Sequence, residues 1–358
     1  MIAALTALWL AQGAVADTIR IATYNVELDR DGPGLLLRDI LRGEDPQVAA
    51  VAQVVARVAP DILVLQRVDY DLELQALTAL RDMLAESGPE YPHLFALRPN
   101  TGMATGLDLD GDGRVAEPRD AQGYGEFSGQ RGMAVLSRYP LEAEKARDFS
   151  ALLWRDLPGA LLPEMDGAPF PSPEAQAIQR LSTVGHWVVP VRVGDTALDL
   201  MVFHASPPVF DGPEDRNGRR NHDELKFWQH YLDGQFGAPS DAPFVLLGDA
   251  NLDPADSDGR RVAIAELLSD PRVQDPRPMR AGDVVGDPGH RGDPRLDTVE
   301  WPAPGPGALR IDYILPSADL RVAEAGIYWP EEGSEAAEIM RAASRHRLIW
   351  VDLQLDMQ

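Results

Sequence analysis

The sequence contains no cysteine. This absence excludes disulfide bonds and thiolate nucleophiles, and any bound metal must take carboxylate, amide or imidazole ligands. Positive charge is also scarce, because 33 lysine and arginine residues stand against 57 aspartate and glutamate residues, for a formal net charge of −24. Such a surface repels polyanions, whereas nucleic-acid-binding proteins normally carry a basic surface. Long DNA or RNA is therefore disfavoured as a substrate, although the charge could equally serve solubility.

Long hydrophobic runs are missing except at the N-terminus. Residues 1–16 are apolar and end in Ala14-Val15-Ala16, a small-x-small pattern typical of signal peptide cleavage. The run is too short for a standard transmembrane helix. We expect a signal peptide over 1–16, a single mature domain over 17–358, no transmembrane segment and a periplasmic or secreted location. The alternative is a buried N-terminal helix.

Hydrophobic periodicity predicts an α/β fold. An alternating β-prone run covers 18–24, valines at helical spacing cover 48–58, a continuous apolar run covers 62–65, and leucines at helical spacing cover 77–84. The order strand, helix, strand, helix is typical of α/β proteins. Further candidate strands cover 133–136, 187–193, 197–203, 244–247 and 309–315. No linker divides the chain, so we predict two packed sheets with flanking helices.

A later helix is predicted from a stripe of Leu225, Trp228 and Leu232 between two candidate strands. The stripe favours a core-facing helix over a cofactor contact. Asn221 lies just before this stripe and is the predicted N-cap.

A Gly-, Asp- and Pro-rich segment over about 99–130 is predicted to be a long loop. Within it, residues 108–113 alternate acids and place glycine sixth, as calcium-binding loops do. Arg119 occupies the twelfth position, where such loops carry glutamate, so Glu117 or Asp120 would have to complete the site. The candidate ligands of a structural Ca²⁺ are Asp108, Asp110 and Asp112. The alternative is a solvated acidic turn.

Several predicted strands end in a polar residue, and a further polar segment precedes the last apolar run. The polar residues are Asn25, Glu27, His204, Asp249, Asn251, Asp312 and His346. Ligands of α/β proteins usually bind at the carboxyl ends of strands, so we expect these side chains to share one site. Taken singly, each histidine could be a hydrogen-bonded core residue, and Asp312 could be a turn carboxylate.

In this order, the segments resemble the endonuclease/exonuclease/phosphatase family. The matching pieces are Asn25-Val26-Glu27, 60–66, 132–140, His204, 248–251, Asp312-Tyr313 and His346. They extend over most of the chain, from residue 19 to residue 352. The resemblance implies a four-layer α/β sandwich, with two stacked mixed β-sheets flanked by helices. It also implies hydrolysis of phosphate mono- or diesters with a divalent cation, for which we expect Mg²⁺.

The resemblance assigns roles that suit the chemistry, because phosphoester hydrolysis needs an aligned water and neutralisation of phosphoryl charge. Asp249 would orient or deprotonate the water, and Asn251 would donate to a phosphate oxygen. His204 and His346 would donate to the phosphoryl or leaving oxygen, with Asp312 holding His346. The catalytic residues implied are thus His204, Asp249, Asn251, Asp312 and His346, and Asn25 would contact phosphate.

Two positions depart from the family pattern. Arg67 replaces the metal-binding glutamate that usually follows the glutamine of the second strand, and Arg345 replaces the aspartate of a usual Ser-Asp-His motif. Three interpretations remain open. The metal could be held by Glu27 with Asp69 or Asp71, the arginines could replace the cation as phosphate contacts, or catalysis could be lost while binding survives.

Arg131, just before a strand that matches the family, is a further candidate phosphate contact. Together these features predict an exported, monomeric phosphoesterase acting on small or lipid-linked phosphate esters. The alternatives are an extracellular nuclease and a phosphate-ester-binding protein with a degraded catalytic site.

Overall fold

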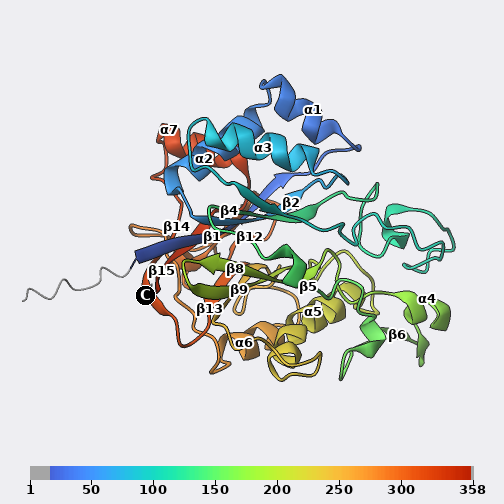
Figure 1. The fold of residues 1–358 in the computed structure, drawn as a ribbon. Coiled ribbons are helices and arrows are strands. Elements are labelled where there is room, and N and C mark those ends of the chain that lie inside the picture. The colour runs from blue at the N-terminus through green and yellow to red at the C-terminus, as the bar shows by residue number, and fades with distance from the viewer. Residues whose placement is uncertain (1–16, 356–358) are drawn as a thin grey trace, which may run out of the picture.

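The computed structural model describes residues 17–355, in which two β-sheets stack face to face (Figure 1). The first sheet has the order β14 (Arg321–Ile327), β15 (Ile349–Leu355), β1 (Asp17–Leu28), β2 (Ile62–Val68), β4 (Gly132–Ser137) and β3 (His93–Phe95). The second has the order β13 (Asp312–Pro316), β10 (Phe244–Asp249), β9 (Thr196–His204), β8 (His186–Val193) and β5 (Arg147–Asp148). Both sheets are mixed, because β1–β2 and β9–β10 pair in parallel while their other neighbours are antiparallel.

Helices cover the outer face of each sheet (Figure 1). The first sheet carries α1 (Leu35–Arg42), α2 (Pro46–Val58), α3 (Gln75–Ala85) and α7 (Glu335–Ala343), and the second carries α5 (Arg216–Leu232) and α6 (Val262–Leu268). Smaller elements are α4 (Pro173–Ile178), β6 (Glu164–Met165), β7 (Ala168–Pro169), β11 (Val299–Trp301) and β12 (Gly307–Leu309). Short 3-10 turns are η1 (Pro118–Asp120), η2 (Ala143–Lys145), η3 (Trp154–Asp156) and η4 (Pro294–Leu296). The expected four-layer sandwich is confirmed.

The core forms three apolar layers because successive strand residues point to opposite faces. In β2, Leu63 and Leu65 pack under the helices, whereas Ile62 and Val64 pack between the sheets, where they join Trp187 of β8. Burial on both faces requires a continuous apolar run, and this is why 62–65 lacks alternation. The third layer joins the second sheet to α5 and α6.

Most sequence-predicted elements are confirmed, including the helices over 48–58 and 77–84 and the long loop over 99–130. The strand predicted over 309–315 is wrong in its bounds, because β12 ends at Leu309 and β13 begins at Asp312. Asn221 is not an N-cap. The helix already begins at Arg216, and the Asn221 side chain donates from inside it to the carbonyls of Ser206 and Ala250, each at 2.7 Å.

The predicted signal peptide lies outside the described residues. Within 17–355, no helix combines the length and the apolar character needed to cross a membrane.

Candidate active site

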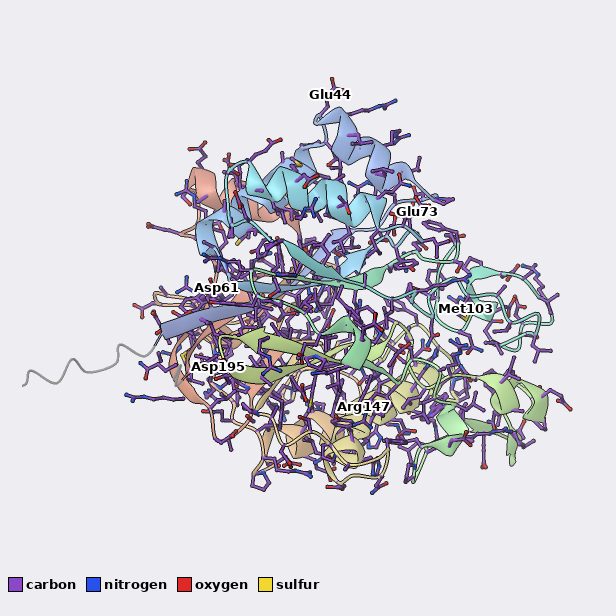
Figure 2. The ribbon with its side chains drawn as sticks, viewed as in Figure 1. Glu44, Asp61, Glu73, Met103, Arg147 and Asp195 are labelled. Carbon is purple, nitrogen blue, oxygen red and sulfur yellow. The ribbon has the colours of Figure 1, made fainter. Side chains whose placement is uncertain are left out.

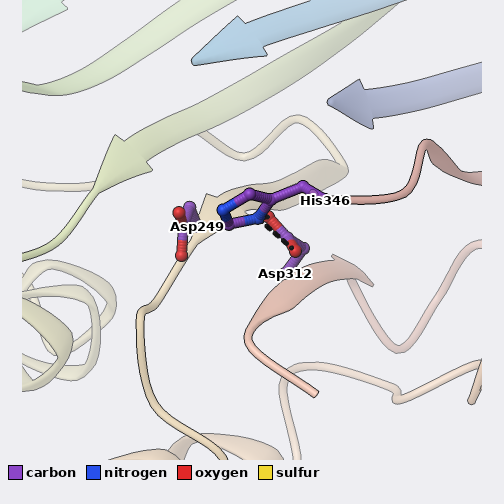
Figure 3. A group of neighbouring side chains, drawn as sticks. All are labelled: Asp249, Asp312 and His346. Atoms are coloured by element: carbon purple, nitrogen blue, oxygen red, sulfur yellow. Dashed lines mark hydrogen bonds and ion pairs between the residues drawn. The ribbon is translucent and has the colours of Figure 1, made fainter. Parts of the chain in front are cut away.

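Three predicted site residues lie in one row across the second sheet. Asp249 at the end of β10 is in register with His204 on one side and with Asp312 on the other. Asn25 reaches them from β1 of the first sheet, and its Nδ2 donates to Asp249 Oδ2 at 2.8 Å. His346, between α7 and β15, completes the group (Figure 3). The fold therefore brings together residues more than 300 positions apart in the sequence.

His346 and Asp312 form a buried pair. His346 Nδ1 donates to the two carboxylate oxygens of Asp312 at 3.0 and 3.2 Å, and Thr298 Oγ1 donates to Asp312 Oδ2 at 2.8 Å. Burial would lower the pKa of His346, but the charge and hydrogen bond of Asp312 outweigh it and raise the pKa above its usual value. Because Asp312 engages Nδ1, the second ring nitrogen is left to point toward Asp249 (Figure 3). An imidazolium in this position can donate a proton.

Asp249 is fully buried and lies 3.5 Å through Oδ2 from His204 Nε2. Burial and the negative charge of Asp312 raise the pKa of Asp249 to about 7, although His346 and the Asn25 hydrogen bond act in the opposite direction. Burial, with the positive charges of Arg67 and His346, lowers the pKa of His204 to about 3. At neutral pH, His204 is therefore uncharged, and Asp249 is suited to exchange a proton with water.

Two predicted phosphate contacts are engaged with protein groups. Asn25 donates to Asp249, as described above. The main-chain amide of Asn251 donates to Asp249 Oδ1 at 2.7 Å, and its side chain donates to the carbonyl of Ala205 at 3.0 Å. Both residues thus hold Asp249 and its surroundings in place.

Beside this group lies a cluster that we call the arginine group, formed by Arg67, Arg131 and Arg345. Arg67 pairs with Glu27 Oε1 at 2.8 Å and with Asp29 Oδ1 at 2.6 Å. Arg131 Nε donates to Asp29 Oδ2 at 2.9 Å. Arg345 donates to Glu27 from its main-chain amide at 2.9 Å and from its Nε at 3.0 Å. Arg67 and Arg345, the two expected departures from the family pattern, therefore both point toward Glu27.

Glu27 and Asp69, the predicted metal ligands, have other partners. Burial would raise the pKa of Glu27, but hydrogen bonds from Arg345 and the charges of His346 and Arg67 lower it to about 2. Asp69 accepts main-chain hydrogen bonds from Arg30 at 2.9 Å and Arg131 at 3.1 Å, and burial raises its pKa to about 6. The donors around Glu27 are cations, so this position does not fit a divalent metal ion. The alternative ligand Asp71 accepts from the first main-chain amides of α3.

Two other groups within 17–355 have ligand atoms close enough together to hold a metal ion. One is Asp249, Asp312 and His346, and the other is Asp108, Asp110 and Asp120, with ligand atoms in each group within 4.8 Å of one another. The second lies in the predicted calcium loop. Asp120 joins it in place of Asp112, whose Oδ1 accepts from the amide of Arg114 at 2.8 Å.

Backbone irregularities shape the site. The register of β1 shifts between Asn25 and Leu28, and that of β2 shifts between Gln66 and Val68. Glu27, Arg67, Arg131 and Asn251 have φ values of 49°, 57°, 58° and 50°, which non-glycine residues seldom adopt. Such bulges redirect side chains, and strained residues gather at functional sites.

Asp29, which bridges Arg67 and Arg131, was missed by sequence reasoning. It follows the first-strand motif by only two residues, but no pattern marks an acid whose partners come from other strands. Its partnership with Arg131 spans 102 positions of sequence.

Comparison with known proteins identifies the family and the fold. The model of the Endonuclease/Exonuclease/phosphatase family matches residues 22–346. A solved endonuclease/exonuclease/phosphatase from Beutenbergia cavernae DSM 12333 is 17% identical, with a TM-score of 0.55 over 94% of this chain and 72% of that chain. A family protein from Leptotrichia buccalis C-1013-b is 16% identical, with a TM-score of 0.52 over 94% of this chain and 100% of that chain. No curated protein matches. At these identities, the solved structures show the shared fold alone.

Proposed function

Because the chain belongs to the endonuclease/exonuclease/phosphatase family of phosphoester hydrolases, we propose that it is an exported enzyme cleaving small or lipid-linked phosphate mono- or diesters. The observation that supports this proposal best is the convergence of Asn25, His204, Asp312 and His346 on Asp249. These groups combine a proton acceptor, a proton donor and orienting partners within one buried site.

The groups suit a hydrolytic step. A water attacks phosphorus and gives its proton to Asp249, while the ester P–O bond breaks. The leaving oxygen takes a proton from His346, whose charge Asp312 stabilises. Neutral His204 donates a hydrogen bond to a phosphoryl oxygen, and Asn251 contributes its remaining amide hydrogen.

Charge supports small esters over long nucleic acids. The net charge is −24, and acidic side chains such as Glu44, Glu73 and Asp195 project from separate parts of the surface (Figure 2). A polyanion would meet this surface over a wide area, whereas a single phosphate meets mainly the arginine group. From the sequence features we further propose that the protein acts as a monomer, without a nucleic-acid partner, in the periplasm or outside the cell.

Cofactors form a second part of the proposal. The family depends on divalent metals, and a bound cation would supply charge neutralisation of the phosphoryl oxygens. Asp249 and Asp312 are the residues whose oxygens could hold Mg²⁺, because Glu27 is paired with arginines and the neighbouring His346 keeps its proton for the leaving oxygen. Structural Ca²⁺ is proposed for Asp108, Asp110 and Asp120. Equilibrium dialysis should show Ca²⁺ uptake that Asp110→Ala removes, and unchanged uptake would refute this site.

The activity is tested with bis(p-nitrophenyl) phosphate, p-nitrophenyl phosphate and plasmid DNA, each assayed with EDTA, Mg²⁺ or Mn²⁺. We expect turnover of at least one small ester, and a loss of about 100-fold or more in Asp249→Asn and His204→Ala. Asp61→Asn is the matched control, because its carboxylate pairs with Arg138 at the opposite end of β2.

The alternatives predict different results. Faster cleavage of plasmid DNA than of either small ester would identify a nuclease. Absence of turnover under every metal condition, with retained binding of phosphate, would identify a binding protein.

A further inference from the structure

We propose that Arg67, Arg131 and Arg345 bind the substrate phosphoryl group directly, and that this binding needs no divalent cation. The inference rests on the proposed function, since it concerns the same phosphate ester. The inference goes beyond the proposed function because it assigns neutralisation of the phosphoryl charge, at the end of β1, to side chains of the protein.

The first support is that Glu27 and Asp29 are already paired with arginine side chains. Glu27 accepts from Arg67 and from both the amide and side chain of Arg345, while Asp29 lies between Arg67 and Arg131. The Glu27 and Asp29 side chains are each only 10% exposed. A metal ion at Glu27 would have to displace two guanidinium groups from a largely buried carboxylate and then lie beside them.

The second support is the charge that remains. Among the paired side chains, three guanidinium groups face two carboxylates, Glu27 and Asp29, which leaves one positive charge in excess. The neighbouring Asp69 carboxylate accepts from main-chain amides and pairs with none of these guanidinium groups. The overall protein carries −24, so this excess is opposite in sign to its surroundings. A phosphate ester is the kind of ligand that such an excess attracts, because guanidinium groups donate bidentately to phosphate oxygens.

The third support is the accessibility of donors. The side chains of Arg345 and Arg131 are 48% and 30% exposed, although their carboxylate partners are nearly covered. Arg131 uses Nε for Asp29, and among the described residues its terminal nitrogens have no hydrogen-bonded acceptor. Its guanidinium carbon lies 5.2 Å from the ring centre of Tyr124, which is itself 46% exposed. These donors can therefore reach a ligand without breaking the pairs that hold them.

The fourth support is the position of the arginine group next to the catalytic group. Arg345 directly precedes His346 in the sequence. Glu27 is linked to Asp249 through Asn25, because the main-chain amide of Glu27 donates to Asn25 Oδ1 and Asn25 Nδ2 donates to Asp249. Arg67 follows Gln66, the β2 residue in register with Asn25. The bulges at Glu27 and Arg67 turn both side chains toward each other beside this register position. A phosphate on the arginine group would thus lie beside Asp249 and His346.

The test measures inorganic phosphate binding by calorimetry in EDTA, in parallel with turnover of bis(p-nitrophenyl) phosphate in EDTA and in Mg²⁺. We expect the unmodified protein to bind phosphate in EDTA, and Arg67→Ala and Arg345→Ala to weaken binding by about 10- to 100-fold, as expected for a lost charged hydrogen bond. Arg138→Ala is the matched control, because Arg138 also pairs with one aspartate, Asp61, at 2.6 Å and should bind phosphate normally.

Arg67→Lys covers the case in which Arg67→Ala fails to fold, because it keeps the charge but loses the planar fork, and it should also bind phosphate more weakly. Phosphate binding that requires Mg²⁺ would overturn the inference and leave the proposed hydrolysis intact, whereas turnover that requires Mg²⁺ while phosphate still binds in EDTA would support the arginine site. Binding unaffected by Arg67→Lys and Arg345→Ala would overturn the inference as well. Phosphate binding in EDTA without turnover under any condition would refute the hydrolytic proposal while supporting the arginine site.

Discussion

Removing the hydrogen bond from Asn25 to Asp249 should move the pH dependence of catalysis toward alkaline pH. The bond is 2.8 Å long, both partners are buried, and it stabilises the carboxylate form of Asp249. Asn25→Ala removes the donor, so the pKa of Asp249, already raised by burial and by Asp312, should rise further. Because Asp249 must be deprotonated to accept a proton, activity rises with pH through this pKa.

The size of the shift follows from the strength of the bond. A hydrogen bond to a charged group contributes about 1.5–3 kcal/mol, and one pKa unit corresponds to about 1.4 kcal/mol. The acidic limb of the kcat/KM profile should therefore move up by about one to two pH units. Near pH 7, where Asp249 is about half ionised in the unmodified protein, kcat/KM should fall by roughly 5- to 50-fold from this effect alone.

The assay is the kcat/KM profile for bis(p-nitrophenyl) phosphate between pH 5 and pH 10, whose limbs report the pKa values of the essential acid and base. Thr23→Ala is the matched control, because Thr23 is also buried in β1 and loses a side-chain hydrogen bond, from Gln66 at 2.8 Å, that does not involve Asp249. Its acidic limb should coincide with that of the unmodified protein. An acidic limb that stays in place in Asn25→Ala would refute the assignment of Asp249 as the proton acceptor.

Three further perturbations test neighbouring groups. Asp312→Asn removes the charge that raises the pKa of His346, so the basic limb of the rate profile should move to lower pH. We also expect kcat to fall by about 100-fold or more. A basic limb that does not move would contradict the role of His346 as proton donor. Glu27 has its pKa lowered from 4.5 to about 2, so it stabilises the fold above pH 4.5, and this stability, about 3 kcal/mol, is lost as pH falls toward 2. Urea unfolding of Glu27→Gln should therefore lack this part of the acid dependence, and an unchanged dependence would show that the ion pairs contribute little. The double variant Arg67→Glu/Arg345→Asp should bind Mn²⁺, which electron paramagnetic resonance detects, whereas the unmodified protein should bind none at Glu27. Equal Mn²⁺ binding by the two proteins would contradict the arginine site.

The sequence alone determined the fold class and marked most of the residues that the fold brings together at the candidate site. Continuous apolar runs such as 62–65 marked strands covered on both faces, because burial on both faces leaves no polar positions. Polar residues after strands marked the site, because parallel strand ends share an edge. This reasoning identified His204 and Asp249, which end the parallel strands β9 and β10. Asp312 lies in the same row for another reason, because it begins β13, which runs antiparallel to β10. The predicted N-cap at Asn221 was wrong because tertiary contacts decide its role: it lies inside α5, and its side chain donates to the carbonyls of Ser206 and Ala250.

Only the tertiary structure decided which partners these residues take. The resemblance marked Arg67 and Arg345 as departures from the expected family pattern. It could not show that both side chains point toward Glu27, because bulges in β1 and β2 set those directions. Nor could it show Asp29 between Arg67 and Arg131. Ion pairs between distant segments depend on separations of a few ångströms that a linear pattern does not encode. Whether Glu27 pairs with guanidinium groups or binds a metal ion is therefore decided by the folded chain.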